Sequence, residues 1–159
     1  VAGLAGFKGV DRRLELKGVV YGIRVVDVYA PHPSEVAAAL QAARVSDRRI
    51  LAVFQPHLYT RTRDFKAAFA RELARADRVV LTDIYPAREE SIQGVDGQLI
   101  ATELRQLGYE KVDYISSCGD LVPFVSTLCK RGHTGLTMGA GNIGEVAEDL
   151  VNFLSGDLR

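Results

Sequence analysis

Histidine and arginine side chains gather in one short segment of the chain, residues 55–62, which read QPHLYTRT. If this segment is extended, alternation places five side chains on one side: Gln55, His57, Tyr59, Arg61 and Arg63. Arginine offers a planar fork of donors to a carboxylate or phosphate, and histidine titrates near neutral pH. The segment therefore favours a site for an anionic ligand. In the alternative, these are solvated loop residues and Arg61 pairs with Asp64.

A second polar segment, residues 27–33, contains Asp27, Tyr29 and His32 directly before an expected helix. The exposed backbone N–H groups of a helix N-terminus attract anions such as phosphate. These residues can therefore indicate a ligand site. Equally, Asp27 or His32 can cap the helix, a common role for a short polar side chain. The residues alone leave both interpretations open.

Residues 83–90, DIYPAREE, form a third polar segment that carries both signs of charge. A surface pair of Arg88 with Glu89 or with Asp83 explains it adequately, and such pairs contribute little to stability. By itself, this segment is a weak signal of function.

The glycines of residues 139–144, GAGNIG, have the spacing of a dinucleotide-binding loop. The full fingerprint also needs a second strand with an acidic residue about 20 positions later. The sequence after this segment provides neither, so we do not expect NAD binding. Close packing or a tight turn between a strand and a helix explains the glycines instead.

Apolar runs that resemble strands alternate along the chain with amphipathic stretches that resemble helices. The strand-like runs are residues 23–28, 50–54, 78–82, 112–115 and 134–138. Such alternation predicts an α/β fold, a Rossmann-like domain of three layers with a mostly parallel sheet. Residues 14–21 are expected to add an edge or antiparallel strand near the N-terminus. The polar segments then fall at the carboxyl ends of the strands, where ligands bind in open sheets.

Composition predicts an ordinary globular domain. The 159 residues suit one domain, and 20 basic against 20 acidic residues give no electrostatic reason for a nucleic-acid or anionic-membrane partner. No apolar run approaches the length of a membrane span. Cys118 and Cys129 have no metal-ligand spacing, so two reduced thiols in a cytoplasmic protein are expected, without a metal site.

Five motifs, taken in order, resemble those of the Mur ligase family, and specifically its alanine-adding MurC type. They are GVDRR at residues 9–13, DVYAPHPSE at 27–35, FQPHLYTRT at 54–62, DIYPARE at 83–89 and LTMGAGNI at 136–143. The resemblance covers nearly all of the chain, and the FQPH motif distinguishes it from sibling ligases that add later amino acids. It implies that residues 1–159 form the C-terminal domain, without the UDP-sugar domain or the P-loop ATPase domain of the family.

The resemblance implies an ATP-dependent ligase of peptidoglycan synthesis, and hence of cell-wall biogenesis, cell shape and cell division. Its substrates would be ATP, L-alanine and UDP-N-acetylmuramate, and its partners the N-terminal and central domains of its own chain. Magnesium would be held mainly by the central domain. By motif position, Arg13, Asp27 and His32 would bind nucleotide, and Tyr29, His57 and Arg61 the substrate side. His57 and Arg61 would be catalytic, although the fragment alone is expected to be inactive.

Three family positions differ in this chain. Val28 replaces an aspartate that contacts the ribose, Pro31 replaces a histidine, and Leu58 replaces an arginine. An apolar side chain cannot accept hydrogen bonds from ribose hydroxyls or hold a carboxylate. These changes motivate an alternative function, a degenerate binding module with impaired catalysis. A second alternative, a generic doubly wound receiver or nucleotide module, does not account for five ordered motifs.

Overall fold

A computed structural model describes residues 13–46 and 49–156 of the chain. Within these ranges the strands are β1 (Glu15–Val20), β2 (Ile23–Tyr29), β3 (Arg49–Phe54), β4 (Arg78–Leu81), β5 (Val112–Tyr114) and β6 (His133–Gly139). The helices are α1 (Pro33–Arg44), α2 (Tyr59–Leu73), α3 (Gln98–Gln106), α4 (Cys118–Leu128) and α5 (Ile143–Ser155). Except for Arg13, the GVDRR motif lies outside the described residues.

The described strands form one sheet in the order β1-β2-β6-β3-β4-β5. Strand β1 is antiparallel to β2, and the remaining neighbours are parallel. The last strand, β6, lies between β2 and β3, so that Leu136 is aligned with Val26 on one side and Ala52 on the other. The α/β, mostly parallel, Rossmann-like fold with an antiparallel edge strand near the N-terminus is thus confirmed.

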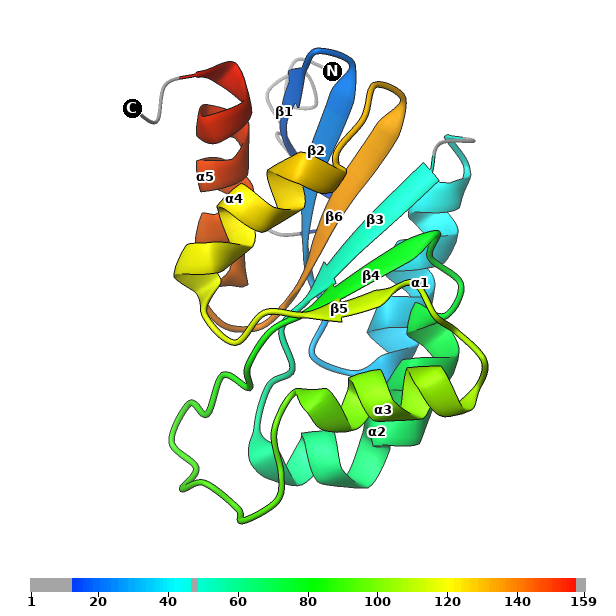
Figure 1. Ribbon diagram of the computed structural model, residues 1–159, viewed down its shortest axis with the longest axis vertical. Coiled ribbons are helices and arrows are strands. Elements are labelled where there is room, and N and C mark those ends of the chain that lie inside the picture. Colours follow the sequence, from blue (N-terminus) through cyan, green and yellow to red (C-terminus); the bar gives the residue numbers. More distant parts are fainter. Residues whose placement is uncertain (1–12, 47–48, 157–159) are drawn as a thin grey trace, which may run out of the picture.

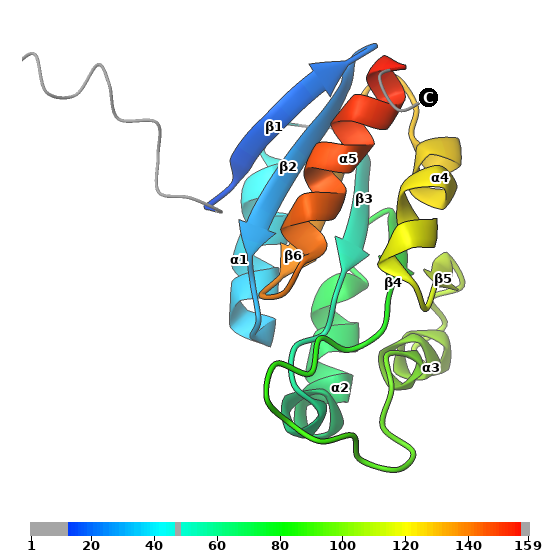
Figure 2. The same ribbon diagram turned by 90° about the vertical axis from the view of Figure 1, so that its left-hand side faces the viewer.

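Helices cover both faces of the sheet, which gives three layers (Figures 1 and 2). Successive residues of β3 point to opposite faces: Phe54 packs in the cluster beneath α1, α2 and α3, whereas Val53 packs beneath α4 and α5. Burial on both faces explains why residues 50–54 of β3 are an unbroken apolar run. Two large apolar side chains of the helical layers stay partly exposed: Phe65 of α2 is 40% exposed, and Leu107 at the C-cap of α3 is 56% exposed.

The carboxyl ends of β2, β6, β3 and β4 meet at one edge of the sheet, as parallel strands require. The long connection from β4 to α3, residues 82–97, extends beyond this edge and passes the start of α2 (Figures 1 and 2). Among the described residues, no helix combines the length and apolar character needed to cross a membrane.

Candidate functional site

His57 and Arg61 contact each other at the start of α2. Because the helix begins at Tyr59, they are neighbours one turn apart, and Arg61 Nη1 lies 3.1 Å from His57 Nδ1. Nη1 also donates to the carbonyl of Pro31 at 3.5 Å, which connects α2 to the loop after β2. The expected extended backbone is therefore wrong from Tyr59 onward, whereas His57 still forms a β-bridge with Tyr85. The suggested Arg61–Asp64 pair is also wrong, since Arg63 Nε holds Asp64 at 2.7 Å.

The contact with Arg61 determines which nitrogen of His57 carries the proton. A guanidinium only donates, so Nδ1 must accept and the neutral ring carries its hydrogen on Nε2. Partial burial lowers the pKa of His57, and the charge of Arg61 lowers that pKa further, against a weaker opposite effect of Glu89. The pair therefore presents a neutral imidazole N–H beside a permanent cation, a combination suited to an anionic or carbonyl oxygen.

Tyr85, from the β4–α3 connection, stacks on His57. The ring centroids are 6.0 Å apart and the planes are inclined by 13°. Backbone hydrogen bonds fix the two segments together: Tyr85 N donates to Pro56 O at 2.8 Å, and Leu58 N donates to Tyr85 O at 3.0 Å. The imidazole is thus held from the side as well as through Nδ1.

Glu89, in the same connection, caps helix α2. Its carboxylate accepts from the backbone N–H of Thr60 at 3.1 Å and also from the Thr60 hydroxyl. The residue at the N-cap position, Leu58, offers no side-chain cap, so this helix end depends on a distant carboxylate. These hydrogen bonds lower the pKa of Glu89. The suggested pairs of Arg88 are wrong within the described residues, because Glu89 bonds Thr60 and Asp83 accepts from the Tyr114 hydroxyl.

Gln55 caps the start of α5, as Glu89 caps the start of α2. Its side chain is buried, donates to Asn142 Oδ1 at 2.8 Å and accepts from Ile143 N at 3.2 Å. Gly139 and Gly141 allow this close approach: a Cβ at Gly139 would lie 2.8 Å from Gln55 O, and one at Gly141 would overlap the ring of Tyr85. The predicted close-packing role of these glycines is confirmed.

His32 is the N-cap of α1. Its Nδ1 accepts from Ser34 N at 3.3 Å, and Glu35 returns a hydrogen bond to His32 N at 2.8 Å, which completes a capping box. The ring also makes an edge contact with Phe65 of α2, with centroids 5.1 Å apart. The capping interpretation is thus confirmed, and the nucleotide-binding role of His32 stays a prediction.

Asp27 lies inside β2, not in the loop after it. It is fully buried, and Thr137 Oγ1 of β6 donates to its Oδ1 at 2.6 Å. It is not a helix cap, because α1 begins six positions later at Pro33. The carboxylate of Asp27 thus links β2 to β6. Its contact with nucleotide stays a prediction.

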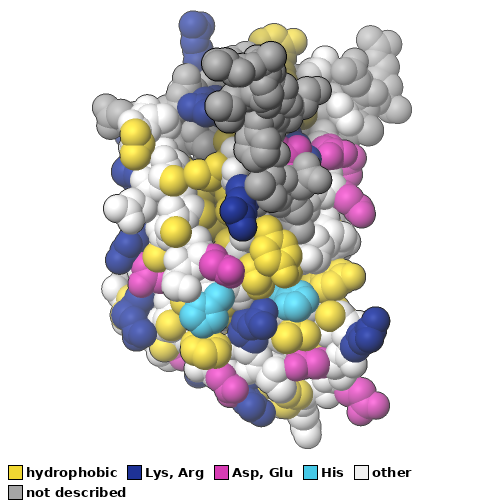
Figure 3. Space-filling model, turned by 180° about the vertical axis from the view of Figure 1, so that it is seen from behind, with side chains coloured by type: hydrophobic (Ala, Val, Ile, Leu, Met, Phe, Trp, Pro, Cys, Tyr) yellow, Lys and Arg dark blue, Asp and Glu magenta, His cyan; other side chains and the backbone are white. Residues whose placement is uncertain are grey.

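A separate pocket lies between the start of β1 and helix α1, with a volume of about 640 Å³. Arg13, Val28 and Tyr29 share its lining, and Tyr29 is half exposed. Arg13 and Tyr29, two of the predicted ligand-binding residues, are therefore brought together here. Histidine, basic and apolar side chains gather on the face seen in Figure 3.

Magnesium, where the family resemblance implies it, is expected to be held mainly by the central domain. Among the described residues, no three histidine, cysteine or acidic side chains converge as metal ligands. Of the nearby groups that could act as metal ligands, His57 Nδ1 faces Arg61 Nη1, and Oδ1 of Asp27 accepts from Thr137.

The sequence analysis assigned no definite role to three residues that contribute to the site: Gln55, Tyr85 and Glu89. One signal could have found Glu89: a helix that begins after Leu58 has no acceptable cap of its own and needs an acceptor from elsewhere.

The sequence matches the family described as "Mur ligase, glutamate ligase domain" over residues 12–141. It is 45% identical over 157 residues to the UDP-N-acetylmuramate–L-alanine ligase of Salinibacter ruber, which covers 98% of this chain and 33% of the relative. The ligase of the same name from Saccharopolyspora erythraea is 50% identical over 143 residues, 89% of this chain and 29% of that one. The chain thus spans about a third of the length of the curated relatives it matches. Nothing in these matches favours the degenerate alternative.

Solved structures show the same relationship. The UDP-N-acetylmuramate–alanine ligase of Thermotoga maritima superposes with a TM-score of 0.73 at 27% identity, over 94% of this chain and 31% of that one. A domain of a ligase from Haemophilus ducreyi has a TM-score of 0.68 at 26% identity, over 89% of this chain and 99% of that domain. The chain therefore belongs to the Mur ligase family, as a C-terminal domain of the MurC type.

Proposed function

We propose that the complete enzyme joins L-alanine to UDP-N-acetylmuramate with ATP, and that this domain supplies part of the amino-acid site. The observation that carries the proposal is the His57–Arg61 pair at the carboxyl edge of the sheet. Among the described residues, Nη1 is the one guanidinium nitrogen of Arg61 with a hydrogen bond, so the remaining donors can serve a carboxylate. The names of the relatives supply the two molecules that are joined, UDP-N-acetylmuramate and L-alanine.

In the proposed reaction, ATP phosphorylates the lactyl carboxylate of UDP-N-acetylmuramate, and the amine of L-alanine attacks the acyl phosphate. An amide, ADP and inorganic phosphate result. Arg61 would hold the alanine carboxylate, with the Nε2–H of His57 as a second donor and Tyr29 on the substrate side. Such fixed donors accelerate the reaction by positioning and by stabilising developing charge.

On the nucleotide side, we propose that Arg13 reaches the phosphates, with Asp27 and His32 nearby. The shared pocket of Arg13 and Tyr29 supports a ligand beside α1. Magnesium would neutralise the phosphates from the central domain, which with the N-terminal domain would be the partner of residues 1–159. A cytoplasmic ligase that serves the cell wall, cell shape and cell division follows from the same proposal.

A ligation assay on the complete enzyme tests the proposal. ATP, L-alanine and UDP-N-acetylmuramate are varied in turn, and the amide product and ADP are both quantified. We expect one ADP per amide, with L-alanine preferred over glycine and L-serine. ADP release without an amide product, or a preference for another amino acid, would contradict it. The chain of residues 1–159 alone should show no turnover.

A further inference from the structure

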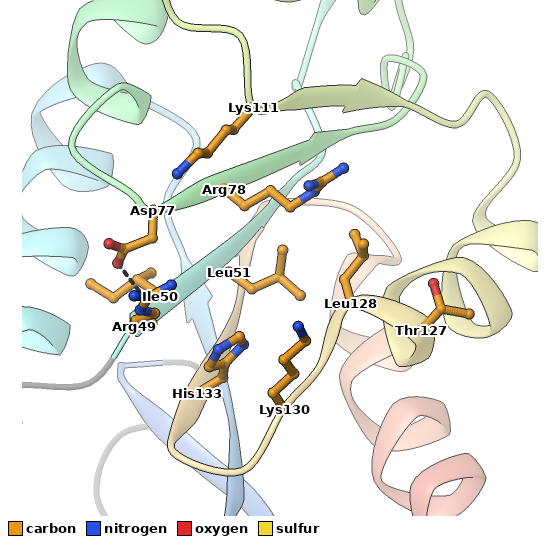
Figure 4. Close-up of a pocket in the computed structure, with 10 residues that line it drawn as sticks. All are labelled: Arg49, Ile50, Leu51, Asp77, Arg78, Lys111, Thr127, Leu128, Lys130 and His133. Atoms are coloured by element: carbon orange, nitrogen blue, oxygen red, sulfur yellow. Dashed lines mark hydrogen bonds between the residues drawn. The ribbon is translucent and has the colours of Figure 1, made fainter.

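A basic pocket of about 290 Å³ lies at the opposite edge of the sheet from the His57–Arg61 pair, where β3, β4, β5 and β6 begin. Figure 4 shows side chains entering it from both sides: Lys130 and His133 from the α4–β6 connection and β6, and Arg78 and Lys111 from β4 and the segment before β5. Ile50, Leu51 and Leu128 add apolar surface to its lining.

Charge in this pocket is unbalanced. Arg49, Arg78, Lys111 and Lys130 line it, whereas Asp77 is the one acidic residue among its lining. The Oδ2 atom of Asp77 already accepts from Arg44 Nη1 and from Ile50 N, each at 2.8 Å. Arg78 has its own partner, Asp113, 2.7 Å from Nη2. Within the described ranges, no carboxylate lies within 4.0 Å of Arg49, Lys111 or Lys130, although Asp77 attracts Arg49 over a longer distance.

The ends of α2, α3 and α4 give a simpler reason for cations at this edge. A helix C-terminus carries partial negative charge, which favours lysine and arginine in its last turn. That effect accounts for a residue such as Arg105, in the last turn of α3. It also suits Lys130, which follows the C-cap of α4, but it does not account for Arg49 and His133, which belong to strands β3 and β6 and line the same cavity. Their crowding is unfavourable: burial first, and then the charges of Arg49 and Lys130, lower the pKa of His133.

We propose that this pocket binds a small anion with more than one phosphate group, of the size of pyrophosphate. Arg49, Lys111 and Lys130 lie on separate segments, and none has a described carboxylate within 4.0 Å, so together they suit several phosphate oxygens better than a single carboxylate. At about 30 Å³ per water molecule, the volume is that of roughly ten waters, enough for an anion of nine heavy atoms. The site is distinct from the one proposed for ligation and does not depend on it.

Isothermal titration calorimetry of the chain with sodium pyrophosphate at low ionic strength tests the proposal. We expect a dissociation constant of about 0.1–1 mM, which rises with added salt because the interaction is electrostatic. Inorganic phosphate, with one phosphate group, should bind more weakly. Lys111→Ala and Lys130→Ala should each weaken pyrophosphate binding by about ten-fold, the loss of one charge-assisted contact.

Two control variants distinguish binding in this pocket from binding to other cations of the chain. Arg105→Ala removes a cation near a helix C-terminus outside the pocket, and Arg61→Ala removes one at the opposite edge. Neither should change pyrophosphate affinity, and thermal denaturation should show that all variants are folded. Absence of binding at 10 mM pyrophosphate would overturn the proposal. So would binding that is lost in Arg61→Ala and retained in Lys130→Ala.

Discussion

The carboxylate of Glu89 accepts a hydrogen bond from the backbone N–H of Thr60 at 3.1 Å across 29 residues of sequence. The link connects the β4–α3 connection to the first turn of the helix that carries Arg61. The same connection stacks Tyr85 on His57. One surface loop thus holds both members of the proposed amino-acid site.

We expect Glu89→Gln in the complete enzyme to raise the KM for L-alanine while the KM for ATP changes little. Glutamine keeps the shape but loses the charge that complements the helix N-terminus and the strength of a charged acceptor. Steady-state kinetics with each substrate varied in turn measures this. Glu90→Gln, a matched change at the exposed neighbour, is the control. An alanine KM equal in both variants would show that Glu89 does not position the site.

Arg61→Ala should raise the KM for L-alanine by about ten- to hundred-fold, the loss of one charge-assisted contact. Arg61→Lys should rescue poorly, because an ammonium cannot reproduce a bidentate fork. Substrate-by-substrate kinetics of the complete enzyme gives the answer. If the KM for ATP rises instead and that for alanine stays constant, Arg61 serves the nucleotide.

Stability should depend on the protonation of His57. Its pKa is lowered in the folded state, so the unfolded chain binds the proton more readily. The contribution of neutral His57 to the free energy of unfolding is therefore complete above the unfolded pKa of about 6.5. It is lost as the pH falls through the lower pKa of the folded state. Melting temperatures of the chain should accordingly decrease from pH 7 to pH 5.

His57→Gln should reduce this decrease. His133 has a pKa shift in the same direction, so His133→Gln should reduce it further and independently. The decrease in melting temperature from pH 7 to pH 5, measured for the two single variants and for the double variant, gives the contribution of each histidine. A pH profile unchanged by His57→Gln would contradict the proposed neutral imidazole.

Gly141→Ala should destabilise the fold by about 1–3 kcal/mol, the usual cost of overpacking. The added methyl would overlap Tyr85 and approach Gln55 Oε1 to 2.6 Å. Gly119→Ala is the matched control, because its new methyl would meet Ser117 Oγ at 3.4 Å. Chemical denaturation of both variants tests this. Equal stability of Gly141→Ala and the parent chain would mean that the Tyr85 loop moves freely aside.

The fold could be predicted well because each strand carries its own signal. The apolar run of β3 is continuous and occurs between two amphipathic stretches, so its burial on both faces is readable locally. The start of α2 could not be predicted in this way. Leu58 is a poor cap, and the acceptor that permits a helix to begin there is Glu89, far along the chain.

The environment of Asp27 could not be predicted either, because its partner is also distant in the sequence. Its motif suggested a loop residue open to ligand, but Thr137 of β6 donates to it across 110 residues. The sequence can reveal which side chains are able to contact a ligand. It does not reveal which of them the sheet has already used to join distant strands.

The position of β6 also bears on how this domain is made by the ribosome. Strands β2 and β3 leave the ribosome early, but the strand that separates and pairs with both is completed only at Gly139. Until then, each has an unpaired edge, a feature that promotes association with other chains. Nascent chains that stall before His133 should therefore be substrates for chaperones or proteolysis, whereas a chain that reaches α5 can close the sheet.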